Sequence, residues 1–211
     1  MFEDLAVQAE AGMPRSEEAK LIARAKRGQP EAFRALVDAY KERLFAFVQR
    51  TVRNHHEAED ICQGAFVKAF ESLDSYSETY AFSTWLFTIA YRLCLNGLRK
   101  KKAVASDMDF AQLAGISDDA SSELASSEEA RRLKELVWSA VDQLSAAQKA
   151  AVMLFYRENK SCQEIGTVLG IPDVTVKSHL HRAREKLRLV LGEAMVEDWN
   201  VVENRPNLKL G

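Results

Sequence analysis

At 211 residues, the chain is long enough for one large domain or two small ones. Hydrophobic residues make up 47% of it, no apolar run approaches the length of a bilayer span, and the first ten residues are acidic where a signal peptide would be basic and apolar. Three cysteines that are far apart argue against a disulfide framework or a structural zinc site. We therefore expect a cytoplasmic protein with no membrane insertion and no cofactor.

The net charge of −2 conceals an uneven distribution. Residues 103–130 contain no Lys or Arg but seven acidic residues, so the rest of the chain carries +5. Basic residues concentrate at 99–102 and in the last long helical pattern. This asymmetry permits nucleic-acid binding despite the acidic total.

In chain order, residues 1–15 have weak periodicity and are expected to form a flexible lead-in. A short helical pattern begins at Ser16 and ends at Gly28. Pro30 then opens a long helix of about six turns, with apolar residues at three- and four-residue steps, which we expect Asn54 to close.

Two further helices follow. The first is EAEDICQGAFVKAFESL, with the expected inward residues Ile61, Ala65, Phe66, Ala69, Phe70 and Leu73. Gly64 in its middle costs about 1 kcal/mol relative to Ala, which close packing or a bound partner would explain. The second is AFSTWLFTIAYRLCLNGLRKKK, with Phe82, Leu86, Ile89, Ala90, Leu93 and Leu98 inward. Four helices with short loops predict a compact helical domain over residues 16–102.

Residues 103–127 are rich in Ser, Asp and Ala, lack periodicity, and are expected to form a flexible acidic linker. A second helical domain is expected over residues 128–191. It contains RRLKELVWSAVDQL and a following helix that begins with a capping box at Ser145 and Gln148. Residues 192–211 are expected to be a C-terminal tail. The fold class is therefore all-α, with two small helical domains.

The stretch SCQEIGTVLGIPDVTVKSHLHRAREKLRLVL predicts two helices joined by a tight turn. Ser161 and Glu164 form a capping box, Gly170 suits a left-handed helix end, and Pro172 suits the first turn of the next helix. The second helix has an apolar stripe, formed by Val176, Leu180, Ala183 and Leu187. A basic side opposes it. This is the helix-turn-helix arrangement, whose second helix enters the DNA major groove. The alternative is that the charges merely solvate an ordinary helical hairpin.

These motifs together resemble a known family. AEDICQGAFVKAFESLDSY followed by AFSTWLFTIAYRL resembles region 2 of bacterial RNA polymerase sigma factors, and LSAAQKAAVMLFYRENKSCQEIGTVLGIPDVTVKSHLHRAREKLR resembles their region 4. Two such domains joined by an acidic linker are similar to the extracytoplasmic-function group of the sigma-70 family. The resemblance covers residues 16–191.

The resemblance implies three binding surfaces. Polymerase binding is implied for Asp60, Gln63, Phe66 and Val67. Contact with the single-stranded promoter −10 element is implied for the loop 74–84 and the helix after it, in which stacking and cationic groups are Tyr76, Tyr80, Trp85, Arg92, Asn96, Arg99 and Lys100. A core role is an equal alternative for Trp85 and the stronger one for Phe82. Reading of the −35 element is implied for Lys177, Ser178, His181, Arg182 and Arg184.

The implied function is a sigma factor, not an enzyme, that directs core RNA polymerase to specific promoters and helps to melt the −10 region. Its implied partners are the clamp helices of the largest polymerase subunit, the flap of the second subunit, promoter DNA and an anti-sigma protein. Three features depart from the family pattern. Gly64 replaces an acidic residue, the loop DSYSETY lacks the usual glycine and arginine, and Arg92 stands where Asn is common.

The sequence also bears on two other classes of function. A stand-alone DNA-binding regulator would use the same C-terminal domain, but its receiver domain would show strands and a phosphorylatable Asp at a strand end. An enzyme would show a nucleophile set, a Gly-rich phosphate loop or paired carboxylates, and no such motif is visible. The pair His55–His56 near Cys62 has too few companion ligands for a metal site.

Overall fold

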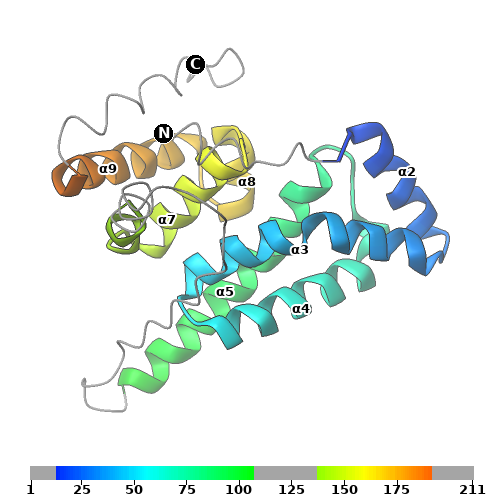
Figure 1. The fold of residues 1–211 in the computed structure, drawn as a ribbon, viewed down its shortest axis with the longest axis horizontal. Coiled ribbons are helices and arrows are strands. Elements are labelled where there is room, and N and C mark those ends of the chain that lie inside the picture. The colour runs from blue at the N-terminus through cyan, green and yellow to red at the C-terminus, as the bar shows by residue number, and fades with distance from the viewer. Residues whose placement is uncertain (1–12, 107–136, 192–211) are drawn as a thin grey trace, which may run out of the picture. The chain divides into compact units, whose positions relative to one another are not determined.

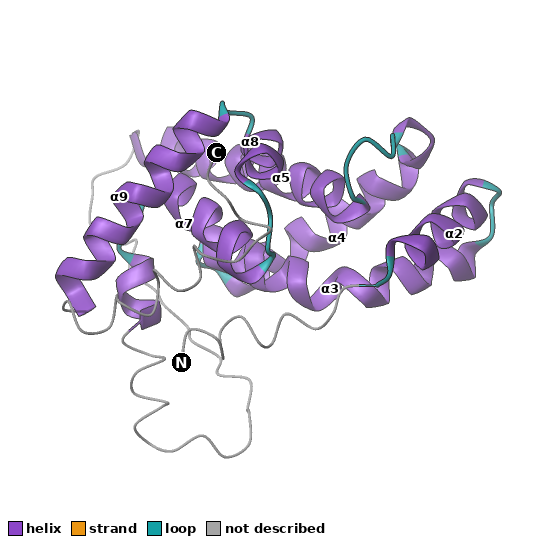
Figure 2. Cartoon of the chain, turned by 90° about the horizontal axis from the view of Figure 1, so that it is seen from above, coloured by secondary structure: helices purple, strands orange, loops and turns teal. Residues whose placement is uncertain are grey.

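The computed structural model describes residues 13–106 and 137–191, which form helices and connecting loops only (Figures 1 and 2). They belong to two compact units, here called the N-terminal unit (13–106) and the C-terminal unit (137–191). The expected all-α class with two helical domains is confirmed. No helix within these ranges combines the length and apolarity that a bilayer span requires.

The N-terminal unit is built around α3. Its elements are α2 (Arg15–Lys26), α3 (Pro30–Val52), α4 (His55–Glu71), the 3₁₀ turn η1 (Leu73–Ser75) and α5 (Phe82–Ser106). Helix α3 packs against α2, α4 and α5 (Figure 1). Phe47 of α3 lies in the centre of the core, with its ring centroid 5.1 Å from that of Phe87 on α5. An apolar side chain at this junction holds the helices together by removing its large surface from water.

One helix boundary differs from the sequence prediction. Asn54 does not close α3: the helix ends at Val52, and the C-cap residue is Arg53, with a left-handed φ of 59°. The Asn54 side chain instead accepts a hydrogen bond from the backbone N–H of Glu57 at 2.9 Å and so caps the start of α4. Asparagine suits both the C-terminal end of one helix and the N-cap of the next, and which helix it caps depends on the free backbone group that its side chain reaches.

The predicted inward faces of α4 and α5 were partly wrong. Phe70 is 56% exposed and contacts Phe33 edge-on, with 5.0 Å between the ring centroids. Ile89, Leu93 and Leu98 are only half-buried. The burial of Phe87, Tyr91 and Cys94 was not predicted. Because α5 packs on both α3 and α4, its buried face is wider than one apolar stripe.

Close packing does not explain Gly64. A Cβ at this position would lie 3.6 Å from Leu93 Cδ1, which is an ordinary van der Waals contact.

The helix α5 extends to Ser106, beyond the expected domain end at 102. The lead-in before residue 13, the linker from 107, residues 128–136 and the tail 192–211 lie outside the described residues.

The C-terminal unit contains a helical segment at 137–142, α7 (Ala146–Val152), the π-helical turn η2 (Met153–Arg157), α8 (Cys162–Leu169) and α9 (Asp173–Leu191). The capping box of Ser145 and Gln148 is confirmed by reciprocal bonds of 3.3 and 3.0 Å. The π-helical turn was not predicted. It accompanies burial of Met153, Leu154 and Phe155, three consecutive apolar residues that an α-helix would direct away from a single face.

Two buried lysines of this unit are paired with acids. Lys149 Nζ lies 3.4 Å from Asp142 Oδ1, and Lys160 Nζ lies 3.4 Å from Glu164 Oε1. Both side chains are less than a tenth exposed. A buried ammonium group is tolerated when a carboxylate compensates its lost hydration, so these pairs join the helical segment at 137–142 to α7 and the approach loop to α8.

Candidate functional site

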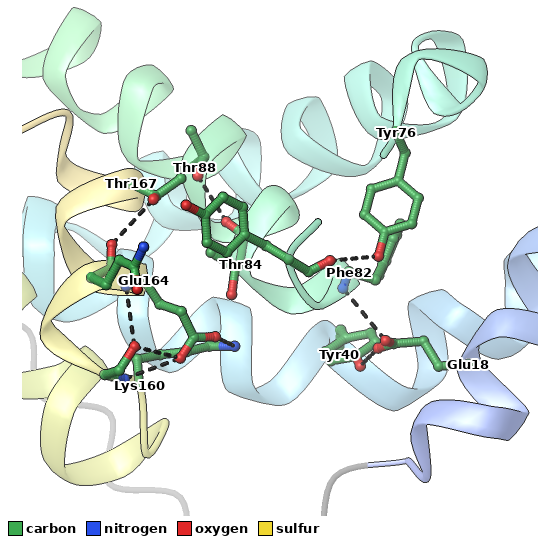
Figure 3. A network of polar contacts seen from close by, with 12 residues as sticks. Glu18, Tyr40, Tyr76, Phe82, Thr84, Thr88, Lys160, Glu164 and Thr167 are labelled. Carbon is green, nitrogen blue, oxygen red and sulfur yellow. Dashed lines mark hydrogen bonds and ion pairs between the residues drawn. The ribbon is translucent and has the colours of Figure 1, made fainter. Parts of the chain in front are cut away.

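Helix α8, the first helix of the helix-turn-helix in the C-terminal unit, begins and ends as predicted. The Ser161 side chain accepts from the Glu164 N–H at 3.2 Å, and the Glu164 carboxylate accepts from the Ser161 N–H at 3.1 Å (Figure 3). Gly170 ends α8 with a left-handed φ of 69°. Pro172 precedes α9 instead of lying in its first turn, and its carbonyl accepts from the N–H groups of Thr175 and Val176.

Sequence reasoning missed Gly166 as a determinant of this turn. A Cβ there would lie 2.7 Å from the carbonyl oxygen of Ile171, closer than real side chains approach. The Ile171 N–H donates to the Gly166 carbonyl at 3.0 Å. The chain after α8 therefore folds back directly onto the helix backbone, which requires a residue without a side chain.

Helix α9 has two distinct sides. The predicted apolar stripe is confirmed, since all four of its residues are at most 1% exposed: Val176, Leu180, Ala183 and Leu187. On the other side, Ser178, His181 and Arg182 are exposed, and Lys177 and Arg184 are partly exposed. The Arg184 side chain bends back and donates to the Leu180 carbonyl at 3.3 Å. The structure therefore brings four of the five predicted −35 residues to one accessible surface and draws Arg184 towards its own helix.

The predicted −10 residues lie partly in an aromatic cluster. Tyr76 is only 7% exposed, and its hydroxyl donates to the Tyr80 carbonyl at 2.8 Å. Its ring centroid lies 5.3 Å from that of Trp85 and 5.6 Å from that of Phe82. Tyr76 was expected to offer a stacking surface for bases, and burial of its ring removes that surface. Trp85 packs against Phe82 and is half-buried, so it combines a packing contact with a part that remains accessible.

The rest of the predicted −10 residues form a stripe along α5. Arg92, Asn96 and Arg99 are exposed and follow Trp85 by 7, 11 and 14 residues. At about 100° per residue, these spacings keep all three within about 40° of Trp85, over a length of about 21 Å. Lys100 is exposed beside them. A partly exposed aromatic ring followed by cations and an amide can hold the bases and the phosphates of a single strand.

A buried carboxylate from α2 holds the start of α5. Ala81 precedes this helix and has no side-chain acceptor for its first N–H groups. Instead, the Phe82 N–H donates to Glu18 Oε2 at 3.4 Å, and the Tyr40 hydroxyl donates to Glu18 Oε1 (Figure 3). Glu18 is only 6% exposed. A carboxylate at a helix N-terminus also interacts favourably with the helix dipole.

The contacts around Glu18 change the pKa of Tyr40 and are joined by a second link between α2 and the loop before α5. Burial, and then the bond and charge of Glu18, raise the pKa of Tyr40. Lys26 of α2 donates to the Tyr76 carbonyl at 3.0 Å, a second link between α2 and the loop before α5. Sequence reasoning missed Glu18, which resembles an ordinary first-turn acid. The absence of a capping side chain at Ala81 was the available signal.

The predicted polymerase-binding residues lie on α4. Asp60, Gln63 and Val67 are exposed on one side of the helix, whereas Phe66 is half-buried. Val67 is 55% exposed and lies three residues before Phe70 on the helix surface, so the two side chains form an apolar patch. Phe70 had been predicted to lie in the core. Exposed apolar side chains with adjacent polar groups are typical of a protein-binding surface.

The cysteines and histidines of the described residues do not form a chemical centre. No group of three His, Cys, Asp or Glu residues in ranges 13–106 and 137–191 is placed to hold a metal ion. Cys62 and Cys94 are both buried, and burial raises the pKa of each thiol to about 12. These thiols are therefore protonated at neutral pH and suit packing rather than nucleophilic chemistry.

Comparison with known proteins assigns both units to one family. Sigma-70 region 2 matches residues 36–104, and sigma-70 region 4 matches residues 134–187. The chain belongs to the sigma-70 family of transcription initiation factors. It is 35% identical to the extracytoplasmic-function (ECF) RNA polymerase sigma factor SigW of Bacillus subtilis over 182 residues, which are 80% of this chain and 94% of that protein. This similarity agrees with the ECF group.

One further relative and one solved structure are also sigma factors. The RNA polymerase sigma-H factor of Pseudomonas aeruginosa is 30% identical over 185 residues, which cover 83% of this chain and 94% of that protein. The structure of the sigma factor RpoE in complex with the anti-sigma factor NepR, from Bartonella quintana, matches with a TM-score of 0.66 at 25% identity. That match covers 76% of this chain and 97% of the solved chain.

Proposed function

We propose that this protein directs core RNA polymerase to specific promoters and helps to melt the −10 region, acting by binding and not as an enzyme. One observation carries the proposal: the chain has, in the same order as the sigma-70 regions, an α5 stripe suited to single-stranded DNA and then a helix-turn-helix with an exposed polar side. Binding to polymerase would take place in the cytoplasm.

Each surface has a proposed role. The exposed side of α4 binds the clamp helices of the largest subunit, and the C-terminal unit binds the flap of the second subunit. The stripe of Trp85, Arg92, Asn96, Arg99 and Lys100 holds the −10 strand, with the partly exposed Tyr80 in the preceding loop and Tyr76 supporting that loop from within. Because Arg92 has only donors, it favours a base that presents acceptors or a phosphate.

The −35 element is proposed to be read by α9. Lys177, Ser178, His181 and Arg182 are among the exposed or partly exposed polar groups in its first turns, where recognition helices meet base edges. An anti-sigma protein is proposed as an inhibitor, by likeness to RpoE, which was solved with its anti-sigma factor.

The test is transcription with purified core polymerase on a randomised promoter library. Arg182→Ala and Lys177→Ala should each weaken −35 recognition by about 1–3 kcal/mol if the lost contact is to a base edge. Both variants should bind core polymerase as the wild type does in a pull-down. Loss of polymerase binding would contradict these roles, and tight sequence-specific DNA binding without polymerase at physiological salt would favour a stand-alone regulator.

A further inference from the structure

An exposed valine lies in the middle of the polar side of α9. Val174 is in the first turn of the helix and is 66% exposed. At about 100° per residue, Lys177, Ser178 and His181 all lie within about 60° of it around the helix axis. The buried stripe, represented by Leu180, lies on the opposite side. Val174 is therefore part of the surface proposed to face DNA.

The backbone around Val174 is held in place. Its N–H donates to Asp173 Oδ1 at 2.8 Å, and its carbonyl accepts from the Ser178 hydroxyl at 3.1 Å. A β-branched side chain in a helix also strongly prefers one rotamer. The backbone that carries the exposed Val174 side chain is thus positioned before any ligand binds.

Single exposed apolar residues are common on protein surfaces and usually have no function. The position of Val174 distinguishes it, because the first turn of a recognition helix approaches base edges. Valine offers no hydrogen bond to a base. The apolar group that the major groove presents is the C5-methyl group of thymine.

We propose that Val174 is a specificity residue that contacts the methyl group of a thymine in the −35 element. This inference rests on the proposed function, since it requires α9 to lie in the major groove. Lys177 and Ser178 flank the contact and supply the charge and hydrogen bonding that Val174 lacks. Selectivity at this base pair then comes from a dry methyl–methyl contact and not from a polar one.

The experiment uses holoenzyme assembled from core polymerase and the full chain, with a promoter selected from the randomised library as the probe. Each thymine of its −35 element is replaced, one at a time, by deoxyuridine, which lacks only the methyl group. With the wild type, one replacement should weaken binding about fourfold, the worth of burying one methyl-sized group. With Val174→Ala, that same replacement should have little effect.

Leu189→Ala is the matched control, because Leu189 is the other large exposed apolar residue described on α9 and lies 15 residues further along, about 22 Å away. This variant should keep the wild-type response to deoxyuridine. The proposal is overturned if the selected element has no thymine, if no replacement weakens binding, or if Val174→Ala responds as the wild type does. Arg182→Ala distinguishes failure of the Val174 contact from failure of the proposed role of α9. If Arg182→Ala weakens promoter binding while Val174→Ala keeps the wild-type response to deoxyuridine, only the valine contact is wrong. If neither variant changes promoter binding, the proposed reading of the −35 element by α9 is also wrong.

Discussion

The bridge from Glu18 to the start of α5 can be tested by the substitution Glu18→Gln, which changes the chemistry but hardly the shape. The carboxylate offers one oxygen to the Tyr40 hydroxyl and the other to the Phe82 N–H. An amide has only one oxygen, so its NH₂ group must face one of these donors. If the NH₂ group faces the Tyr40 hydroxyl, that oxygen can accept from it, but the hydroxyl proton loses its carboxylate acceptor; if it faces Phe82, the backbone N–H loses its acceptor. Either way, one donor inside a buried site is left without the acceptor it had.

The expected cost follows from the burial of the site. Glu18 is 6% exposed, so water cannot replace the lost acceptor. A buried donor without a partner costs about 1–3 kcal/mol, and the bonds lost here are made to a charged acceptor. We therefore expect Glu18→Gln to lower the free energy of unfolding by about 2 kcal/mol. The start of α5, beside Trp85, should become less ordered.

Urea unfolding followed by circular dichroism measures the stability, and 2-aminopurine fluorescence in the −10 element measures promoter opening. Glu17→Gln is the matched control, because Glu17 is the exposed neighbour in the same helical turn and should change stability by less than about 0.5 kcal/mol. Glu18→Gln should also slow opening while leaving the pull-down of core polymerase unchanged. A Glu18→Gln protein as stable as the Glu17→Gln protein would refute the bridge.

Three further predictions concern stability. Gly166→Ala should destabilise the protein by about 2 kcal/mol or more in thermal unfolding, because its Cβ would lie 2.7 Å from a backbone carbonyl that cannot move without opening the turn; an unchanged melting temperature would contradict this. Gly64→Ala should stabilise the protein by about 0.5–1 kcal/mol in urea, since the added methyl has room, and a loss of stability would show that the packing is tighter than described. Burial raises the pKa of Cys62 and Cys94 from 9.0 to about 12, so the unfolded thiols lose protons first. Their contribution should be complete below about pH 9 and decline up to about pH 12, and a urea midpoint that is constant over this range would exclude the effect.

The sequence was sufficient for features that depend on neighbouring residues. The two capping boxes, the left-handed Gly170 and the apolar stripe of α9 are all confirmed, because each is determined within one or two helical turns. The all-α class followed from the same local periodicity, whereas the family resemblance rested on two sequence motifs and their order along the chain. The assignment of residues to promoter and polymerase contacts stays a prediction.

The tertiary structure alone decided features that join distant parts of the chain. Glu18 reaches a helix start that is 64 residues away, and Phe70 is exposed although its spacing is that of a core residue. Tyr76 lies in a polar loop and is nevertheless buried by Phe82 and Trp85. Helical periodicity reports which residues share a face, but it cannot report what covers that face. Only the packing of one helix on another determines whether a side chain is a contact within the protein or a surface for a partner.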